Sequence, residues 1–80
     1  MTVDELTLIY AEVLETPGIA PDEDFFAAGG DSLLATRVLS AVYRAGGGEL
    51  TFEDFVAHPT PAALSTLLIG RQASPLGVAP

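Results

Sequence analysis

The sequence has no cysteine and no lysine, and its only basic residues are Arg37, Arg44 and Arg71. The lack of cysteine excludes disulfide bonds and thiolate metal sites. Eleven acidic residues give the chain a formal net charge of −8. Because phosphate binding needs clustered cations, we expect no nucleic-acid partner, and the same deficit argues against anionic membranes.

The sequence also lacks a signal peptide and any apolar run long enough to cross a bilayer, so we expect a cytoplasmic protein. Eighty residues make one domain with a single small core. Such a core leaves little room for the deep pocket of an autonomous enzyme. The acidity has two open interpretations: it keeps the domain soluble, or it complements a basic partner surface.

Four segments carry helical signals, and no strand pattern is present. Each begins after a residue that caps helices well, and each ends at glycine or next to proline. We therefore predict an all-α, four-helix bundle over residues 1–70, with a short third helix and a flexible tail or linker remnant over 71–80. The predicted helices are Val3–Glu15, Ser32–Ala45, Phe52–Ala57 and a fourth from Pro61 to Gly70.

A long loop, residues 16–31, joins the first two predicted helices. We expect Phe25 and Phe26 to pin this loop to the core, with a single helical turn at residues 25–28. On the second helix, helical angles put Leu34, Val38, Ala41, Val42 and Ala45 on the inward arc. The outward arc then holds Leu33, Arg37, Ser40 and Arg44, so that Leu33 is an apolar residue on a polar face.

The junction between this loop and the second helix holds most of the residues that could carry chemistry. Three kinds of site can be tested there and at the other glycine-rich turn, and the sequence supports none of them well. A calcium loop starting at Asp22 fails because Phe26 and Ala27 occupy its fifth and sixth positions. A hydrolase elbow around Ser32 has Leu34 where glycine is needed, and the single histidine, His58, makes a triad poorly supported. The triple glycine 46–48 has no lysine after it, which excludes a P-loop.

Ser32 remains as a hydroxyl at a helix N-terminus with no general base near it in the sequence. Such a hydroxyl cannot activate itself, but it can accept a group if another protein brings the catalyst. The unpaired N–H groups of a helix start favour an anion there, so a phosphate ester would suit the position. On these grounds alone, Ser32 or Asp31 could equally be a plain helix cap.

The motif as a whole resembles the phosphopantetheine attachment site of peptidyl carrier (thiolation) domains of nonribosomal peptide synthetases, in the acyl-carrier-like superfamily. The resemblance covers about residues 3–70. It is carried by the loop phenylalanines, then Gly-Gly-Asp-Ser-Leu-Leu-Ala-Thr at 29–36, then Phe-Glu-Asp-Phe at 52–55 and His-Pro-Thr-Pro-Ala-Ala-Leu at 58–64. The three parts together, in this order, are specific, whereas Asp-Ser-Leu alone would be weak.

The resemblance implies that Ser32 receives a covalent 4′-phosphopantetheine from coenzyme A through a Mg²⁺-dependent phosphopantetheinyl transferase. The thiol of that arm would carry aminoacyl or peptidyl groups as thioesters. Asp31 would cap the helix and contact the transferase, and Asp31 and Leu33 would lie beside the cofactor. Leu33, Arg37 and Phe26 would be read by partners, and no residue would be catalytic. Those partners would include an adenylation domain and condensation, thioesterase or tailoring enzymes of antibiotic or other secondary metabolism, and the carrier would be a monomer.

Other functions stay open on the sequence alone. Asp31 stands where many peptidyl carriers have histidine, and an acid there is common in acyl and aryl carriers of polyketide or hybrid pathways. A different class is an acidic helical interaction module without a covalent arm. A small hydrolase that uses Ser32 and His58 is the least supported hypothesis.

Overall fold

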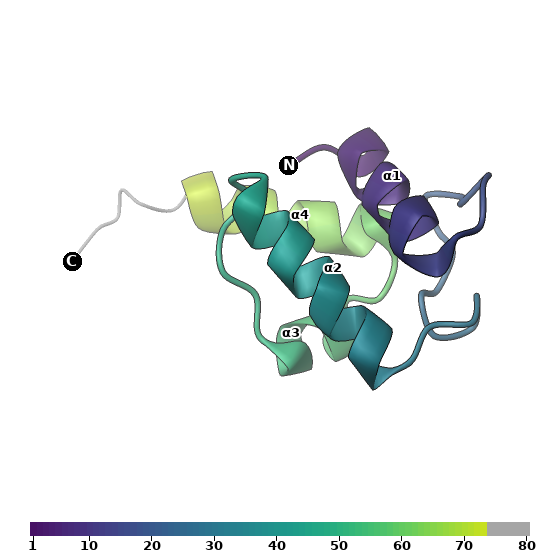
Figure 1. Ribbon diagram of the computed structural model, residues 1–80. Helices are drawn as coiled ribbons and strands as arrows, with labels where there is room; N and C mark the ends of the chain where they lie inside the picture. Colours follow the sequence, from purple (N-terminus) through teal and green to yellow (C-terminus); the bar gives the residue numbers. More distant parts are fainter. Residues whose placement is uncertain (74–80) are drawn as a thin grey trace.

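Four helices make up the regular structure of residues 1–73, the part of the chain that the computed structural model describes (Figure 1). They are α1 (Val3–Leu14), α2 (Ser32–Arg44), α3 (Phe52–Ala57) and α4 (Pro61–Ala73). α1 packs against both α2 and α4, and the short α3 packs against α2. No strand forms within these residues, so the predicted all-α, four-helix fold is confirmed.

The helix starts agree with the capping residues in the sequence. At α1, Glu5 N donates to Thr2 Oγ1 at 3.1 Å, and Thr2 N donates to Glu5 Oε1 at 2.9 Å. Thr51 and Asp54 form the same reciprocal pair at the start of α3. These bonds satisfy N–H groups that have no partner inside the helix, which is why such short segments start at defined residues.

The predicted end of the fourth helix is wrong, and the first two helices each end one residue earlier than predicted. α4 does not stop at Gly70 but continues to Ala73. A glycine inside a helix costs only about 1 kcal/mol, which a tertiary contact in the following turn can offset. That contact comes from Arg71, which binds the first turn of α3. Residues 71–73 of the predicted tail are therefore helical, and residues 74–80 lie outside the described part of the chain.

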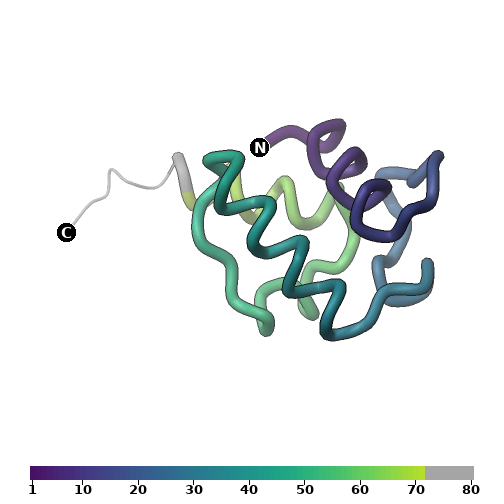
Figure 2. The backbone as a smooth tube through the Cα atoms, in the orientation of Figure 1, coloured from purple at the N-terminus to yellow at the C-terminus, as the bar shows by residue number. Residues whose placement is uncertain are grey.

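One further expectation needs correction. Ala45, placed on the inward arc, is exposed, whereas Ala35 is buried on α2. The inward arc ends earlier than predicted, because α2 stops at Arg44 and Ala45 belongs to the turn after it. Residues 25–28 form the single predicted turn, which is closed by Ala28 N donating to the Asp24 carbonyl oxygen at 2.9 Å. Figure 2 shows how the long loop, residues 16–31, turns back along the end of the bundle.

An aromatic cluster fills the centre of the molecule. Tyr10, Phe25 and Phe55 are fully buried, and Phe26 is partly buried beside them. Their rings meet edge to face, with centroids 5.0 Å apart for Phe25 and Phe55 and 5.1 Å apart for Tyr10 and Phe25. The cluster joins α1, the long loop and α3, which confirms that the two loop phenylalanines pin the loop to the core.

The carbonyl oxygen of Pro59 is the polar centre of this cluster. It accepts a hydrogen bond from Tyr10 Oη at 2.7 Å and another from Phe25 N at 3.1 Å. The Tyr10 hydroxyl is a donor at neutral pH, and burial, with the charge of Asp24 as a smaller cause, raises its pKa, so it remains a donor in alkaline solution as well. A second link nearby, from Ala62 N to the Pro21 carbonyl at 2.9 Å, ties the loop to the start of α4.

An ion pair closes the opposite end of α4. Arg71 forms a two-pronged contact with Asp54, with Nη1–Oδ2 and Nη2–Oδ1 distances of 2.9 Å, and also donates to the Glu49 carbonyl at 3.3 Å. The hydrogen bonds from Arg71 and the Thr51 backbone hold the pKa of Asp54 below its usual value. Asp54 thus caps α3 and anchors the last turn of α4 at once.

Replacing Tyr10 with phenylalanine should lower the free energy of unfolding by about 1 kcal/mol, because one hydrogen bond to the Pro59 carbonyl is lost while Phe25 N still satisfies it. Chemical denaturation of Tyr10→Phe against wild type measures this. The matched control is Tyr43→Phe, whose exposed hydroxyl forms no hydrogen bond to a described residue. Equal effects of the two substitutions would contradict the role assigned to Tyr10.

Candidate functional site

The hydroxyl of Ser32 is displayed at the first residue of α2. Ser32 is exposed, and its Oγ makes no hydrogen bond within residues 1–73. Asp31 is the N-cap, and its Oδ1 accepts from Leu34 N at 2.9 Å. The N–H groups of Ser32 and Leu33 have no partner in the described residues and lie at the positive end of the helix dipole. A phosphate on Ser32 would meet both features.

Two glycines shape the approach to Ser32, each for a different reason. Gly29 has a φ of 110°, a backbone conformation that side-chain-bearing residues rarely adopt. Gly30 has an ordinary φ but no space: a Cβ there would collide with the ring of Phe25 and lie 2.8 Å from the Phe25 carbonyl oxygen. Gly30 N also donates to that carbonyl at 3.0 Å. The loop therefore lies directly on the aromatic cluster two residues before Ser32.

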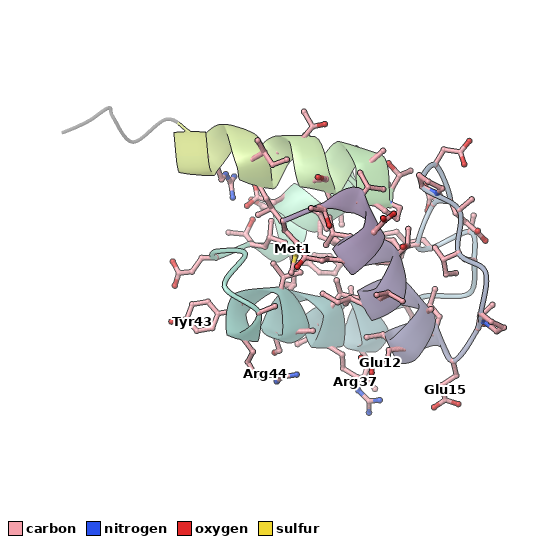
Figure 3. All side chains as sticks on the ribbon, turned by 90° about the horizontal axis from the view of Figure 1, so that it is seen from above. Met1, Glu12, Glu15, Arg37, Tyr43 and Arg44 are labelled. Atoms are coloured by element: carbon pink, nitrogen blue, oxygen red, sulfur yellow. The ribbon has the colours of Figure 1, made fainter. Side chains whose placement is uncertain are left out.

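The surface beside Ser32 is formed by the outward arc of α2. Leu33 is 66% exposed, as its predicted orientation requires, and Arg37 is exposed one turn later. A groove of about 390 Å³ starts at Leu33 and runs between α2 and the end of α1. Figure 3 shows Arg37 and Arg44 on α2, with Glu12 of α1 and Glu15 just after that helix along the same side of the molecule.

Phe26 and His58, the other residues considered in the sequence analysis, have structural contacts of their own. Phe26 is partly buried against Phe25 and Phe55, with a centroid distance of 5.5 Å to Phe25. His58 caps the end of α3, where its Nδ1 lies 3.1 Å from the Asp54 carbonyl oxygen. The structure gives His58 no contact with Ser32, so it supplies no support for a hydrolase. In the described part of the chain, no three acidic, histidine or cysteine residues cluster as metal ligands would.

Sequence reasoning missed the contact between Gly30 and Phe25 and the ion pair between Asp54 and Arg71. No local signal reveals either one, because each joins residues from separate elements. Arg44 is a site residue that the pattern does contain, since it falls on the outward arc with Leu33 and Arg37. Within residues 1–73, no helix has both the length and the apolar character needed to cross a bilayer.

Comparison with known proteins gives a consistent match. The family described as phosphopantetheine attachment site matches residues 4–68. The chain is 40% identical over 72 residues to CymA of Salinispora arenicola, described as a probable non-canonical nonribosomal peptide synthetase, and the match covers 90% of this chain. It is 42% identical over 65 residues to a linear gramicidin synthase of Brevibacillus parabrevis, a match that covers 81% of this chain. The chain spans only 1% of the length of either relative.

A solved structure agrees with the sequence relatives. The chain resembles a component of the complex of the phosphopantetheine transferase Sfp with coenzyme A and a peptidyl carrier protein, with a TM-score of 0.84 and 32% identity. The similarity covers 89% of this chain and 92% of that one. The likeness therefore extends over nearly the whole of both chains rather than over the serine motif alone.

Gly30→Ala should lower the free energy of unfolding by about 2–3 kcal/mol, because the added methyl group must displace the buried ring of Phe25. The matched control is Gly70→Ala in α4, where a Cβ meets nothing within 4 Å. That substitution should raise the free energy of unfolding by about 0.5–1 kcal/mol, since alanine favours the helix. Denaturant titration of both variants measures the contrast, and a neutral Gly30→Ala would disprove the packing argument.

Proposed function

The chain belongs to the family of phosphopantetheine-attachment domains, and we propose that it is a peptidyl carrier whose attachment residue is Ser32. The observation that carries this assignment is the exposed Ser32 hydroxyl at the start of α2, between the glycine pair and the exposed Leu33. The domain itself performs no catalysis. It tethers aminoacyl or peptidyl groups for the enzymes of nonribosomal peptide synthesis.

The residues around Ser32 fit a phosphopantetheine group. The two unpaired N–H groups of the first helical turn can receive phosphate oxygens, and Gly29 and Gly30 leave the approach without side chains. The carboxylate of Asp31 is held on Leu34 N, so its cap is formed before any group is attached. When bound, the group supplies a flexible arm that ends in a thiol, to which a carried acid is joined as a thioester.

Loading requires an external enzyme, because the described structure gives Ser32 no base. The Ser32 oxygen would attack the β-phosphorus of coenzyme A, forming the serine–phosphate bond. The bond to the bridging oxygen breaks, adenosine 3′,5′-bisphosphate leaves, and a base of the transferase accepts the hydroxyl proton. This chain contributes an exposed, rigidly placed nucleophile and a helix start that receives the resulting negative charge.

After loading, the domain raises the effective concentration of its cargo at each partner, because the arm turns an encounter into an intramolecular step. The expected partners are the transferase, an adenylation domain, and condensation, thioesterase or tailoring enzymes. Leu33, Arg37 and Phe26 are proposed as the residues these enzymes read. Contacts must be small and transient, since the carrier leaves each enzyme after one step.

The decisive experiment is loading in vitro. Apo protein incubated with coenzyme A, Mg²⁺ and a broad-specificity phosphopantetheinyl transferase should gain one phosphopantetheinyl mass in intact-protein mass spectrometry, and Ser32→Ala should gain none. Thr36→Ala is a control hydroxyl deletion one turn along α2, and it should still be loaded. An unmodified wild-type chain, under conditions that load a known carrier, would refute the proposal.

Leu33→Ala should reduce processing by partners far more than it reduces stability, because the side chain is 66% exposed. We expect the kcat/KM of transferase loading to fall about tenfold, as for an interface anchor, while the free energy of unfolding changes by about 0.5 kcal/mol or less. Leu64→Ala, at a fully buried leucine, should instead cost about 2–5 kcal/mol of stability. A large thermal destabilisation in Leu33→Ala would show that Leu33 is a core residue.

A further inference from the structure

Two arginines of α2, Arg37 and Arg44, have no acidic partner among residues 1–73, although the chain is strongly acidic. The sequence has eleven acidic residues against three arginines. Within residues 1–73 only Arg71 forms an ion pair. Arg37 and Arg44 are exposed, and neither forms a hydrogen bond to a described residue. Figure 3 shows both side chains projecting from the same side of α2, away from the body of the molecule.

These two arginines form a row that stands between two grooves. They are seven residues apart, about 10 Å along the helix, with the small Ser40 between them. We call Arg37, Ser40 and Arg44 the arginine strip. One groove, of about 390 Å³, separates the strip from α1, and the other, of about 550 Å³, separates it from residues 49–51. Ser40 and Arg44 line both, so the strip is a ridge of the kind that a partner helix can straddle.

The charges beside the strip limit what can bind to it. Glu12 and Glu15 line the groove on the α1 side, and Glu49 lines the other groove. A broad anionic surface would meet these carboxylates and be repelled. The ligand must therefore present its negative charge as one narrow row, with carboxylates about 10 Å apart. The edge of a single α-helix, with acidic residues seven positions apart, has this spacing.

We propose that the arginine strip docks an acidic helix edge of the transferase that loads Ser32, an inference that rests on the function proposed above. That enzyme must bring its catalytic groups to the first residue of α2. Arg44 lies twelve residues further on, about 18 Å along the same helix. A protein interface of about 800 Å² per partner, centred near Leu33, would cover the strip. The docking surface proposed here is positively charged, although the chain as a whole is negatively charged.

The experiment is steady-state loading by a broad-specificity phosphopantetheinyl transferase, with the carrier as the varied substrate. Arg37→Gln and Arg44→Gln should each raise KM about threefold, and the double variant about tenfold, with kcat unchanged. Arg37→Lys and Arg44→Lys should keep most of the wild-type KM, because the charge remains. Both positions are exposed, so thermal unfolding should show that all the variants fold like wild type.

The matched control is Ile69→Glu, which is on α4 and lines neither groove. Like each Arg→Gln change, it takes the formal net charge from −8 to −9 (one charge more negative). Its KM should stay near wild type. An unchanged or lower KM in the arginine variants would overturn the inference, and so would an equal rise in Ile69→Glu. A wild-type chain that is never loaded would instead refute the proposed function, so the two failures are distinct.

Discussion

The carbonyl oxygen of Pro59 is the point on which the rest of the structure depends. Its two hydrogen bonds, from the Tyr10 hydroxyl and from Phe25 N, bring together α1, the long loop and the connection between α3 and α4. The aromatic rings pack around these bonds, and each donor contributes separately, because either one alone still satisfies the carbonyl. Phe25 then supports Gly30 and, through it, the start of α2. The position of Ser32 is thus set by packing that begins at the connection between α3 and α4.

The helix starts could be predicted from the sequence because capping is a local interaction. Thr2 and Thr51 sit three residues before the acids that complete their boxes, so their spacing is visible in the chain. The end of α4 could not be predicted in this way. Its continuation past Gly70 is favoured by Asp54, seventeen residues before Arg71, and the Tyr10 link to Pro59 spans 49 residues. Such pairings depend on how the helices cross, which periodicity does not specify.

The candidate site, like the fold, could be predicted from the sequence where it depends on local features and not where it depends on long-range contacts. The glycine pair, Ser32 and the outward direction of Leu33 all follow from the motif and from helical angles. The motif does not reveal why each glycine is needed. Gly29 is required by its positive φ angle, and Gly30 is required because a side chain there would collide with the ring of Phe25. Net charge is a poor guide to the surface near Ser32. The carboxylates are spread over the chain, while both arginines that lack an ion pair in residues 1–73 lie on the helix that begins at Ser32.

The double role of Asp54 has a mechanical consequence. It closes the first turn of α3 and at the same time holds Arg71 in the final turn of α4. Because Phe55 of α3 belongs to the aromatic cluster, the ion pair couples the last turn of α4 to the buried centre through α3. α3 also exposes Phe52 and Val56 one turn apart. The exposed apolar pair on α3 therefore lies on the same short helix that links the end of α4 to the buried centre.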